Sequence, residues 1–251
     1  MTAALPFLRT DNLSRDFGGV HAVQGVSIEF TEGLIHAVIG PNGAGKTTLA
    51  NLLSGDIAPS AGGIQFRGGD ITDAPPHQIA RLGIGRSYQQ THVIGDMTCL
   101  ENCRLGAQTR RSSRMGFFRA ASAYGDINAF AERALAQVGL ADRAHVLAAN
   151  LSHGEQRQLE IGMVLASDPA LLLLDEPLAG MGLSDSRRMI DLLKALSRSR
   201  TIVLIEHDMD AVFELADILT VMVDGQVLKT GSPDDVRADP MVQQAYLGEA
   251  T

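Results

Sequence analysis

The amino-acid sequence predicts an α/β fold with a mostly parallel sheet that is covered by helices on both faces. Strand patterns alternate with helical patterns along most of the 251 residues, and several strands are unbroken apolar runs, as is typical of a sheet buried on both sides. Between about residues 91 and 166 only helical patterns are convincing, which indicates a helical subdomain inserted into the sheet. With 45% hydrophobic residues, the chain can bury a large core in one domain, and no second domain is required.

The individual elements follow from their apolar periodicity. Strands are expected at residues 28–30, 34–39, 64–66, 84–88, 170–174, 201–205 and 218–223. Helices, which carry apolar residues at spacings of three and four, are expected at residues 47–53, 75–82, 127–138, 154–166, 184–199 and 209–216. Ser184 is the expected N-cap of the fifth of these helices. The Asp224-Gly225 pair is a hairpin-turn signal, so the C-terminal strands should be antiparallel.

Residues 40–47, GPNGAGKT, match the phosphate-binding pattern G-x-x-x-x-G-K-[ST]. In such a loop successive backbone N–H groups surround the phosphates, Lys46 reaches the β and γ oxygens, and the Thr47 hydroxyl can bind Mg²⁺. A glycine-rich turn without a ligand is disfavoured, because an expected strand precedes the loop and an expected helix, whose N-terminus favours anions, follows it. The candidate phosphate-binding residues are Gly40, Asn42, Gly43, Ala44, Gly45, Lys46, Thr47 and Thr48.

The apolar run LLLLDEP, residues 171–177, ends in two carboxylates. A buried strand would deliver Asp175 to the carboxyl edge of the sheet, where ligands of open α/β folds bind and where a carboxylate can hold Mg²⁺. Glu176 would follow at the end of the strand, in a position to polarise a water that attacks a γ-phosphate. Taken alone, the run fits a solvated acidic turn better; together with the phosphate-binding loop it favours a nucleotide site.

Charge and composition exclude several other classes. The net charge of −8 and the pI near 5.3 argue against a nucleic-acid partner, which needs clustered Lys and Arg. Cys99 and Cys103 would share one helix face, and without nearby His or further Cys they are interpreted as buried apolar filler rather than a zinc site. No run approaches the roughly 18 apolar residues of a membrane span, and MTAALPFLRTDN lacks the regions of a signal peptide, so we expect a cytoplasmic protein.

Three further motifs carry a family resemblance. The segment LSHGEQRQLEI, residues 151–161, resembles the LSGGQ signature of ATP-binding cassette (ABC) ATPases. The glutamine of RSYQ and the histidine of VLIEHD each come after a strand, in the order and spacing of that family. The resemblance covers residues 8–247. It implies a P-loop NTPase core with N- and C-terminal antiparallel strands, in a single domain at 6–248. The core would occupy about 6–90 and 167–248, the helical subdomain about 91–166, and the cofactors would be ATP and Mg²⁺.

The resemblance also assigns roles to particular residues. Gln89 would contact Mg²⁺ and the attacking water, and His207 would contact the γ-phosphate; a lone His is otherwise a surface or helix-capping residue. Phe17 matches the aromatic residue that stacks on adenine, and a core Phe is an equally good interpretation. The start of the signature helix would face the γ-phosphate bound to a second subunit, so that two composite sites form in a dimer. The residues at that helix start are Ser152, His153, Gly154 and Glu155.

Two positions depart from the family pattern. His153 stands where the signature usually has Gly, which places a side chain near the turn that faces phosphate. Gly182, in LAGMG, stands where many relatives carry the Asp of the D-loop, and it cannot supply that carboxylate across the dimer. We therefore expect communication between the two sites to be asymmetric or weaker.

Within the family the chain is most similar to the ATP-binding subunits of branched-chain amino acid importers. The segments that carry this similarity are DFGGVHAV, RSYQQTHVIGDMTCLEN, LSHGEQRQLEIG, LLLLDEPLAGM, IVLIEHDMDAV and AYLGEA. This implies transmembrane permease subunits and a second ATP-binding subunit as partners, with a heterodimer favoured over a homodimer, a solute-binding protein as an indirect partner, and a peripheral position on the cytoplasmic face of the membrane. The alternatives are a urea or short-chain amide importer, a soluble ABC protein of translation or DNA repair, and a nucleotide sensor without turnover.

The arginines of residues 110–119 fit a solvated face or a contact with headgroups or membrane subunits.

Overall fold

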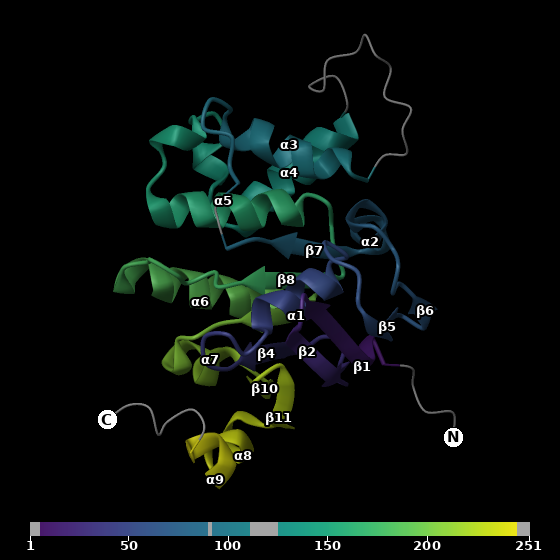
Figure 1. Ribbon diagram of the computed structural model, residues 1–251. Helices are drawn as coiled ribbons and strands as arrows, with labels where there is room; N and C mark the ends of the chain where they lie inside the picture. Colours follow the sequence, from purple (N-terminus) through teal and green to yellow (C-terminus); the bar gives the residue numbers. More distant parts are fainter. Residues whose placement is uncertain (1–5, 90–91, 111–124, 245–251) are drawn as a thin grey trace, which may run out of the picture.

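A computed structural model describes residues 6–89, 92–110 and 125–244. Its larger sheet has six strands in the order β11-β10-β4-β9-β8-β7 (Figure 1). These are β11 (Gln226–Gly231), β10 (Ile218–Val223), β4 (Ile35–Ile39), β9 (Thr201–Ile205), β8 (Leu171–Asp175) and β7 (Ile84–Ser87). All neighbours are parallel except β10 and β11, which form an antiparallel hairpin around Asp224-Gly225. The predicted mostly parallel sheet and the predicted hairpin are both confirmed.

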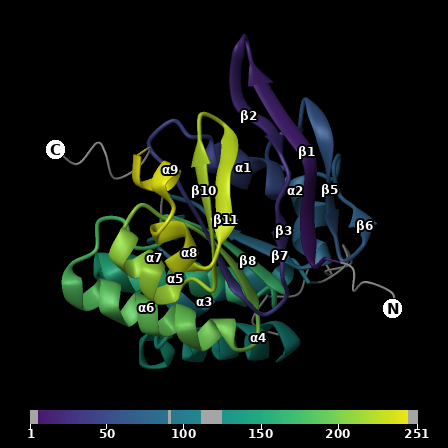
Figure 2. The same ribbon diagram turned by 90° about the horizontal axis from the view of Figure 1, so that it is seen from below.

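A second, antiparallel sheet comes from the N-terminal part of the chain. Its strands are β2 (Val20–Val26), β1 (Leu8–Phe17), β5 (Ala61–Phe66) and β6 (Gly69–Asp70), with β3 (Glu29–Phe30) paired to β1. The hairpin β1–β2 lies beside β10–β11, and the Gln24 backbone N–H donates to the Gly225 carbonyl at 2.8 Å (Figure 2). This contact brings the N-terminal hairpin against the larger sheet.

Alternate residues of the parallel strands serve two different cores. Val38, Leu171 and Leu173 are buried with α1 (Lys46–Leu53) and the antiparallel sheet. Ala37, Leu172 and Leu174 face the opposite way and are buried with α6 (Leu183–Ser197) and α7 (Met209–Leu215). Because both faces are covered, β4, β8 and β9 are buried at every residue and are mainly apolar, as the sequence predicts.

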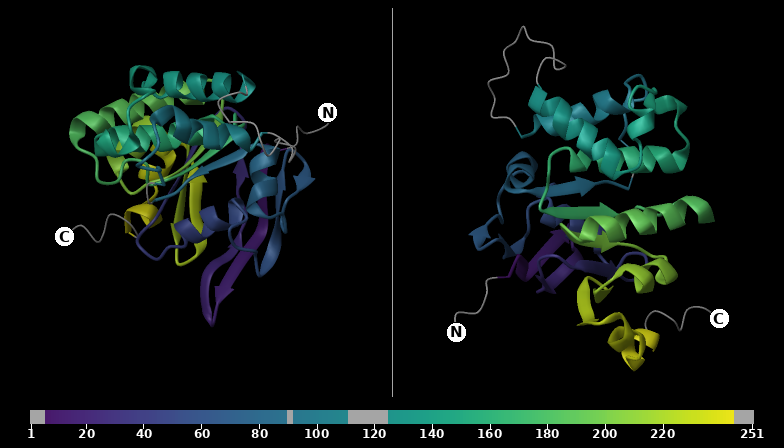
Figure 3. Two further views of the ribbon diagram at one scale, coloured as in Figure 1. Left: turned by 90° about the horizontal axis from the view of Figure 1, so that it is seen from above. Right: turned by 180° about the vertical axis from the view of Figure 1, so that it is seen from behind.

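Three helices lie together beyond the edge strand β7, at the opposite end of the molecule from β11 (Figures 1 and 3). They are α3 (Cys99–Gln108), α4 (Gly125–Gln137) and α5 (His153–Leu165). Cys99 and Cys103 are buried on α3, and burial raises the pKa of the Cys103 thiol to about 12. Among the described residues no group of three or more His, Cys, Asp or Glu is placed to hold a metal ion. The interpretation of both cysteines as buried filler is confirmed.

Several predicted details are wrong. Ser184 is not a helix cap, because α6 begins at Leu183 and its N-cap is Gly182, whose backbone is extended. The N-terminal antiparallel strands that the resemblance implies are present, but no local pattern located β1 and β2, since β1 mixes polar and apolar residues and its pairing with β2 is interrupted by bulges near Arg15. Two short helices near the C-terminus, α8 (Pro233–Arg237) and α9 (Pro240–Val242), were also missed; α2 (Pro76–Leu82) was predicted. No helix within the described ranges is long and apolar enough to cross a bilayer.

Candidate functional site

The phosphate-binding loop joins β4 to α1 and lines a cavity of about 660 Å³. Seven of its eight candidate residues, Asn42 to Thr48, line this cavity, and the eighth, Gly40, does not. The β1–β2 hairpin closes one side with Val20, His21 and Ala22. Gln89 and Glu176, which are 87 residues apart in the sequence, also line the cavity, together with Gln24 and Asp224. The structure therefore brings the loop together with two of the three predicted catalytic residues.

Two glycines of the loop are required by close backbone approach. A Cβ on Gly40 would lie 2.1 Å from the Met222 carbonyl oxygen of β10, and a Cβ on Gly45 would lie 2.2 Å from the Ala22 carbonyl oxygen of β2. Gly45 also has a φ of +92°, in the left-handed region that side chains disfavour. The loop thus packs between the larger sheet and the N-terminal hairpin. This packing fixes the loop's backbone N–H groups, which would surround a phosphate.

We expect Gly45→Ala to destabilise the fold and to weaken nucleotide binding together. Strain at positive φ alone costs about 1–3 kcal/mol, and the overlap with the Ala22 carbonyl adds to it. Urea denaturation measures the loss in the free energy of unfolding. Gly69→Ala is the matched control, because its φ is not positive and its Cβ would come no closer than 3.4 Å to the Phe66 carbonyl. Equal stability of the two variants would contradict this account of the loop.

Lys46 is the first residue of α1 and its side chain folds back over the loop. Its Nζ donates to the carbonyl oxygens of Gly40 at 2.6 Å and Pro41 at 3.0 Å. Burial lowers the pKa of Lys46, against the opposing influence of the carboxylates of Glu176 and Asp175. Thr47 is exposed at the same helix N-terminus. The ammonium group is thus held at the point where the loop backbone turns around the cavity.

Asp175 ends β8, as predicted, but it is paired with an arginine that the sequence analysis did not single out. Its side chain is 2% exposed, and Oδ2 lies 3.3 Å from Nη2 of Arg86 on β7. Burial raises the pKa of Asp175, and the Arg86 guanidinium opposes this effect. Arg86 also donates to Ser54 at 2.6 Å and to Asp56 at 2.8 Å. The arginine links the carboxylate at the sheet edge to the C-terminal end of α1.

Glu176 is the point where three predicted residues meet. Its backbone has a φ of +49°, and its Oε2 accepts a hydrogen bond from Gln89 Nε2 at 3.0 Å. On the other side, His207 Nδ1 lies 3.6 Å from Oε1. The loop that carries His207 is fixed by the fully buried Glu206, which accepts hydrogen bonds from the backbone N–H groups of Leu178 and His207. A carboxylate flanked by an amide and an imidazole is suited to hold and activate a water molecule.

Phe17 is not a core residue. It ends β1 with 45% of its surface exposed, and the Arg15 guanidinium lies 4.7 Å from its ring centroid. Phe17 pairs with Val20, which lines the cavity beside the loop. The structure therefore removes the core interpretation and leaves an exposed ring next to the phosphate-binding cavity.

The predicted signature residues lie away from this cavity, at the start of α5. The Ser152 hydroxyl accepts from the Glu155 N–H at 3.3 Å, and the Glu155 carboxylate accepts from the Ser152 N–H at 2.9 Å, which lowers the pKa of Glu155. A Cβ on Gly154 would lie 2.8 Å from the Asp185 carboxyl carbon of α6, and His153 is exposed. None of these four residues lines the cavity around Lys46. Within one chain the signature and the phosphate-binding loop do not form one site.

Gly182 lies between β8 and α6, with a φ of −73° and no atom within 4 Å of a Cβ built on it. The position is therefore open to other side chains. Leu183, the next residue, is 94% exposed.

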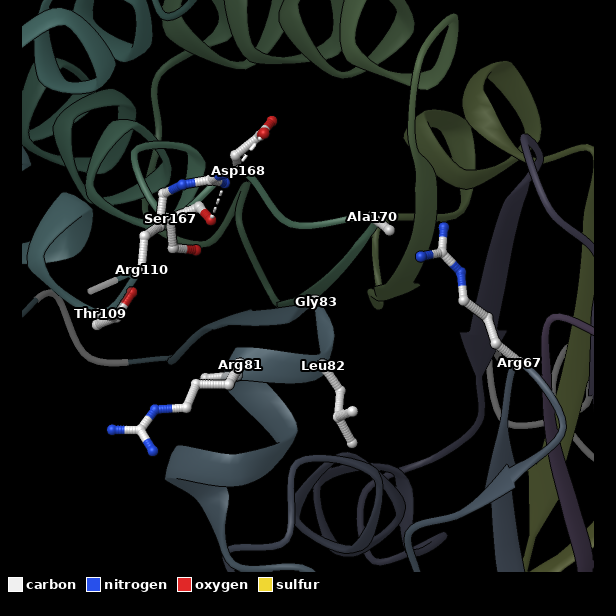
Figure 4. A pocket seen from close by; sticks show the side chains of 10 residues that line it. Arg67, Arg81, Leu82, Gly83, Thr109, Arg110, Ser167, Asp168 and Ala170 are labelled. Carbon is white, nitrogen blue, oxygen red and sulfur yellow. Dashed lines mark hydrogen bonds and ion pairs between the residues drawn. The ribbon is translucent and has the colours of Figure 1, made fainter. Parts of the chain in front are cut away.

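A second cavity, of about 490 Å³, lies between α2, the end of α3 and the loop before β8 (Figure 4). Arg110 on its wall donates to Asp168 and to the Ser167 carbonyl, both at 3.0 Å. This cavity contains none of the predicted site residues. Residues 111–119 of the arginine-rich stretch lie outside the described part of the chain.

Family models match two parts of the sequence. Residues 23–179 match the model of the ABC transporter family, and residues 227–251 match the model of branched-chain amino acid ATP-binding cassette transporters. The first match includes the phosphate-binding loop, the signature and the carboxylates at the end of β8.

Similar proteins and structures cover almost the whole chain. The high-affinity branched-chain amino acid transport ATP-binding protein LivG of Escherichia coli K12 is 36% identical, over 98% of this chain and 99% of that protein. The corresponding protein BraF of Pseudomonas aeruginosa is 35% identical over the same shares. The ADP conformation of the ABC transporter cassette MJ1267 superposes with a TM-score of 0.87 at 30% identity, over 97% of this chain and 99% of that one.

Proposed function

Because this chain belongs to the ATP-binding proteins of ABC transporters, of the branched-chain amino acid type represented by LivG and BraF, we propose that it powers amino-acid import by hydrolysing ATP in the cavity around Lys46. The observation that carries this proposal is the convergence of the phosphate-binding loop, Gln89 and Glu176 on one cavity. The loop binds the phosphates, and Phe17 offers the exposed ring on which adenine stacks. The cargo is a branched-chain or other hydrophobic amino acid.

Mg²⁺ would be held by Thr47, Gln89 and Asp175. Hydroxyl, amide and carboxylate oxygens are the hard donors that Mg²⁺ prefers. Gln89 donates to Glu176 through its Nε2, so its amide oxygen is the atom that would bind the ion. The ion would supply charge neutralisation for the β- and γ-phosphates.

Glu176 is the proposed general base. It takes the proton of the attacking water. The Gln89 amide orients the Glu176 carboxylate through its hydrogen bond and would thereby also orient the water that the carboxylate holds. His207 lies on the opposite side of Glu176 and reaches the γ-phosphate from there. Lys46 neutralises the phosphate oxygens during transfer.

A second ATP-binding subunit would complete each site. The helix start at Ser152, His153, Gly154 and Glu155 lies away from the chain's own loop and presents backbone N–H groups to a phosphate bound elsewhere. Two subunits facing each other would each supply a signature to the loop of the other. We favour a heterodimer over a homodimer, with His153 and Gly182 making the two sites unequal.

The permease subunits would bind at the groove between α2, β7 and the helical subdomain. This groove has a volume of about 350 Å³ and is lined by His77, Tyr88, Gly106 and Met163. Tyr88 directly precedes Gln89 in the chain. A shift of Gln89 at the nucleotide would therefore also move Tyr88, which lines the groove. The chain would then lie on the cytoplasmic face of the membrane, and a solute-binding protein would act only through the permease.

The division into a core at about 6–90 and 167–248 and a helical subdomain at about 91–166 remains a prediction.

Transport assays in the native cells test the cargo. We expect deletion of this chain to abolish high-affinity uptake of labelled leucine and re-expression to restore it. Uptake of labelled urea, measured in parallel, distinguishes the alternative importer. Normal leucine uptake in the deletion strain, with urea uptake lost, would replace the amino-acid cargo by urea and leave the ATPase in place.

A second experiment tests the pairing of subunits. We expect Glu176→Gln, purified alone with ATP and Mg²⁺, to remain a monomer by light scattering, and to dimerise when the second ATP-binding subunit of the same transporter is added. An ATP-dependent dimer of this chain alone would favour the homodimer.

A further inference from the structure

An oppositely charged pair on α5 is buried close to the candidate catalytic residues and has no role in the mechanism above. Arg157 and Glu160 are one turn apart on this helix, and their side chains are only 5% and 6% exposed. Arg157 Nη1 lies 2.8 Å from Glu160 Oε2. A buried ion pair is often no more stabilising than apolar residues of similar size, so its contribution to the free energy of folding does not explain its presence.

The pair holds the backbone of two consecutive residues that follow β7. Arg157 Nη1 donates to the Tyr88 carbonyl at 2.9 Å, and Nη2 donates to the Gln89 carbonyl. Glu160 Oε1 accepts from the Tyr88 N–H at 3.3 Å. The two side chains thus fix this short stretch of main chain to α5 through both terminal guanidinium nitrogens of Arg157 and through Oε1 of Glu160, while Oε2 of Glu160 holds Arg157.

The same stretch carries the side chain that touches the proposed base. Gln89 Nε2 donates to Glu176 Oε2 at 3.0 Å, while the carbonyl of the same residue is held by Arg157. The helix α5 that carries Arg157 begins after its N-cap, Ser152. Arg157 lies about 7.5 Å from Ser152 along the helix axis. Glu176, Gln89, Arg157 and the signature are therefore joined by consecutive hydrogen bonds and one helix.

We propose that Arg157, oriented by Glu160, is a positioning residue that fixes Gln89 to the signature helix, so that Gln89 and Ser152 move together. This role rests on the proposed ATPase function: when Gln89 shifts at the nucleotide bound to its own chain, Arg157 shifts α5 with it. The signature at the start of α5, which would face the nucleotide bound to the second subunit, then changes its orientation. Arg157 does not line the nucleotide cavity, so this role requires no contact between Arg157 and ATP.

Steady-state kinetics of the assembled transporter test the proposal with two substitutions. Arg157→Met removes all hydrogen bonds of the guanidinium. Arg157→Lys keeps a positive charge beside Glu160, but an ammonium cannot donate to two carbonyls with the fork geometry of arginine. We expect kcat to fall by about tenfold to a hundredfold in both variants, since small misplacements of a catalytic group have effects of this size, and KM for ATP to change by less than threefold.

Hydrogen exchange distinguishes a positioning role from a merely structural one. In Arg157→Lys the peptide that contains Tyr88 and Gln89 should exchange faster than in the wild type, while α1 and the phosphate-binding loop should exchange at the wild-type rate. Arg187→Met is the matched control, because it removes an exposed arginine that pairs with Glu214 between α6 and α7 and touches no site residue. It should leave kcat and the exchange at Tyr88 unchanged.

Three outcomes overturn the proposal. These are an unchanged kcat in Arg157→Lys although exchange at Tyr88 is faster, a rise in KM that equals the loss in kcat/KM, and unchanged exchange at Tyr88 and Gln89. Absence of ATPase activity in the wild-type transporter would instead refute the proposed function, before any variant is compared.

Discussion

Glu176→Gln should lower the rate of ATP hydrolysis by about a hundredfold to ten-thousandfold, the usual contribution of a general base, while ATP still binds. The substitution changes one atom of the carboxylate, and the remaining amide oxygen can still accept the hydrogen bond from Gln89. A Gln at this position also meets no new strain, because the φ of +49° is equally unfavourable for both side chains. Only the ability to take a proton from water is removed.

Phosphate release and equilibrium ATP binding are the two measurements. Glu132→Gln on the exposed face of α4 is the control for loss of one carboxylate charge, and it should behave as the wild type. If Glu176→Gln kept the wild-type turnover, another group would have to accept the proton, and the role of Glu176 would reduce to holding Gln89. If ATP binding were lost as well, Glu176 would be a ligand of the nucleotide rather than the base.

The central parallel strands β4, β8 and β9 could be predicted because each is buried on both faces, which leaves a mainly apolar run in the sequence. The same rule fails for β1 and β2. Their polar residues alternate with buried ones such as Leu13 and Val23, and the bulges near Arg15 break the period of two. Their existence depends on pairing with each other and with β5, which no local pattern records.

The phosphate-binding loop and the residues that follow β8 and β9 could be found because each motif is contiguous in the sequence. Arg86, Glu206 and the Arg157–Glu160 pair lie inside the quoted motifs, yet their roles come from partners 28 to 89 residues away. One local signal was available. Opposite charges three residues apart indicate a pair on one helix face, and the apolar Leu159 and Ile161 on either side of Glu160 favour burial of this part of the helix.

The largest effect on transport is expected for Lys46→Ala. Lys46 is the only lysine or arginine among the described residues that line the nucleotide cavity, so the substitution leaves the phosphates without a positive side chain there. A hydrogen bond to a charged group contributes about 1.5–3 kcal/mol, which corresponds to about a tenfold to hundredfold weaker binding of ATP. Loss of the contacts with the Gly40 and Pro41 carbonyls also frees the loop.

High-affinity uptake of labelled leucine, compared between wild type and Lys46→Ala at equal expression, measures the consequence for transport. Lys194→Met, which removes an exposed lysine paired with Glu214, controls for loss of charge, and the melting temperature of each variant controls for folding. We expect uptake to be lost in Lys46→Ala alone, because closure of the dimer needs bound nucleotide. Unchanged uptake together with weaker ATP binding would mean that leucine import does not depend on this site, and the cargo would then have to be sought first among urea and other amides.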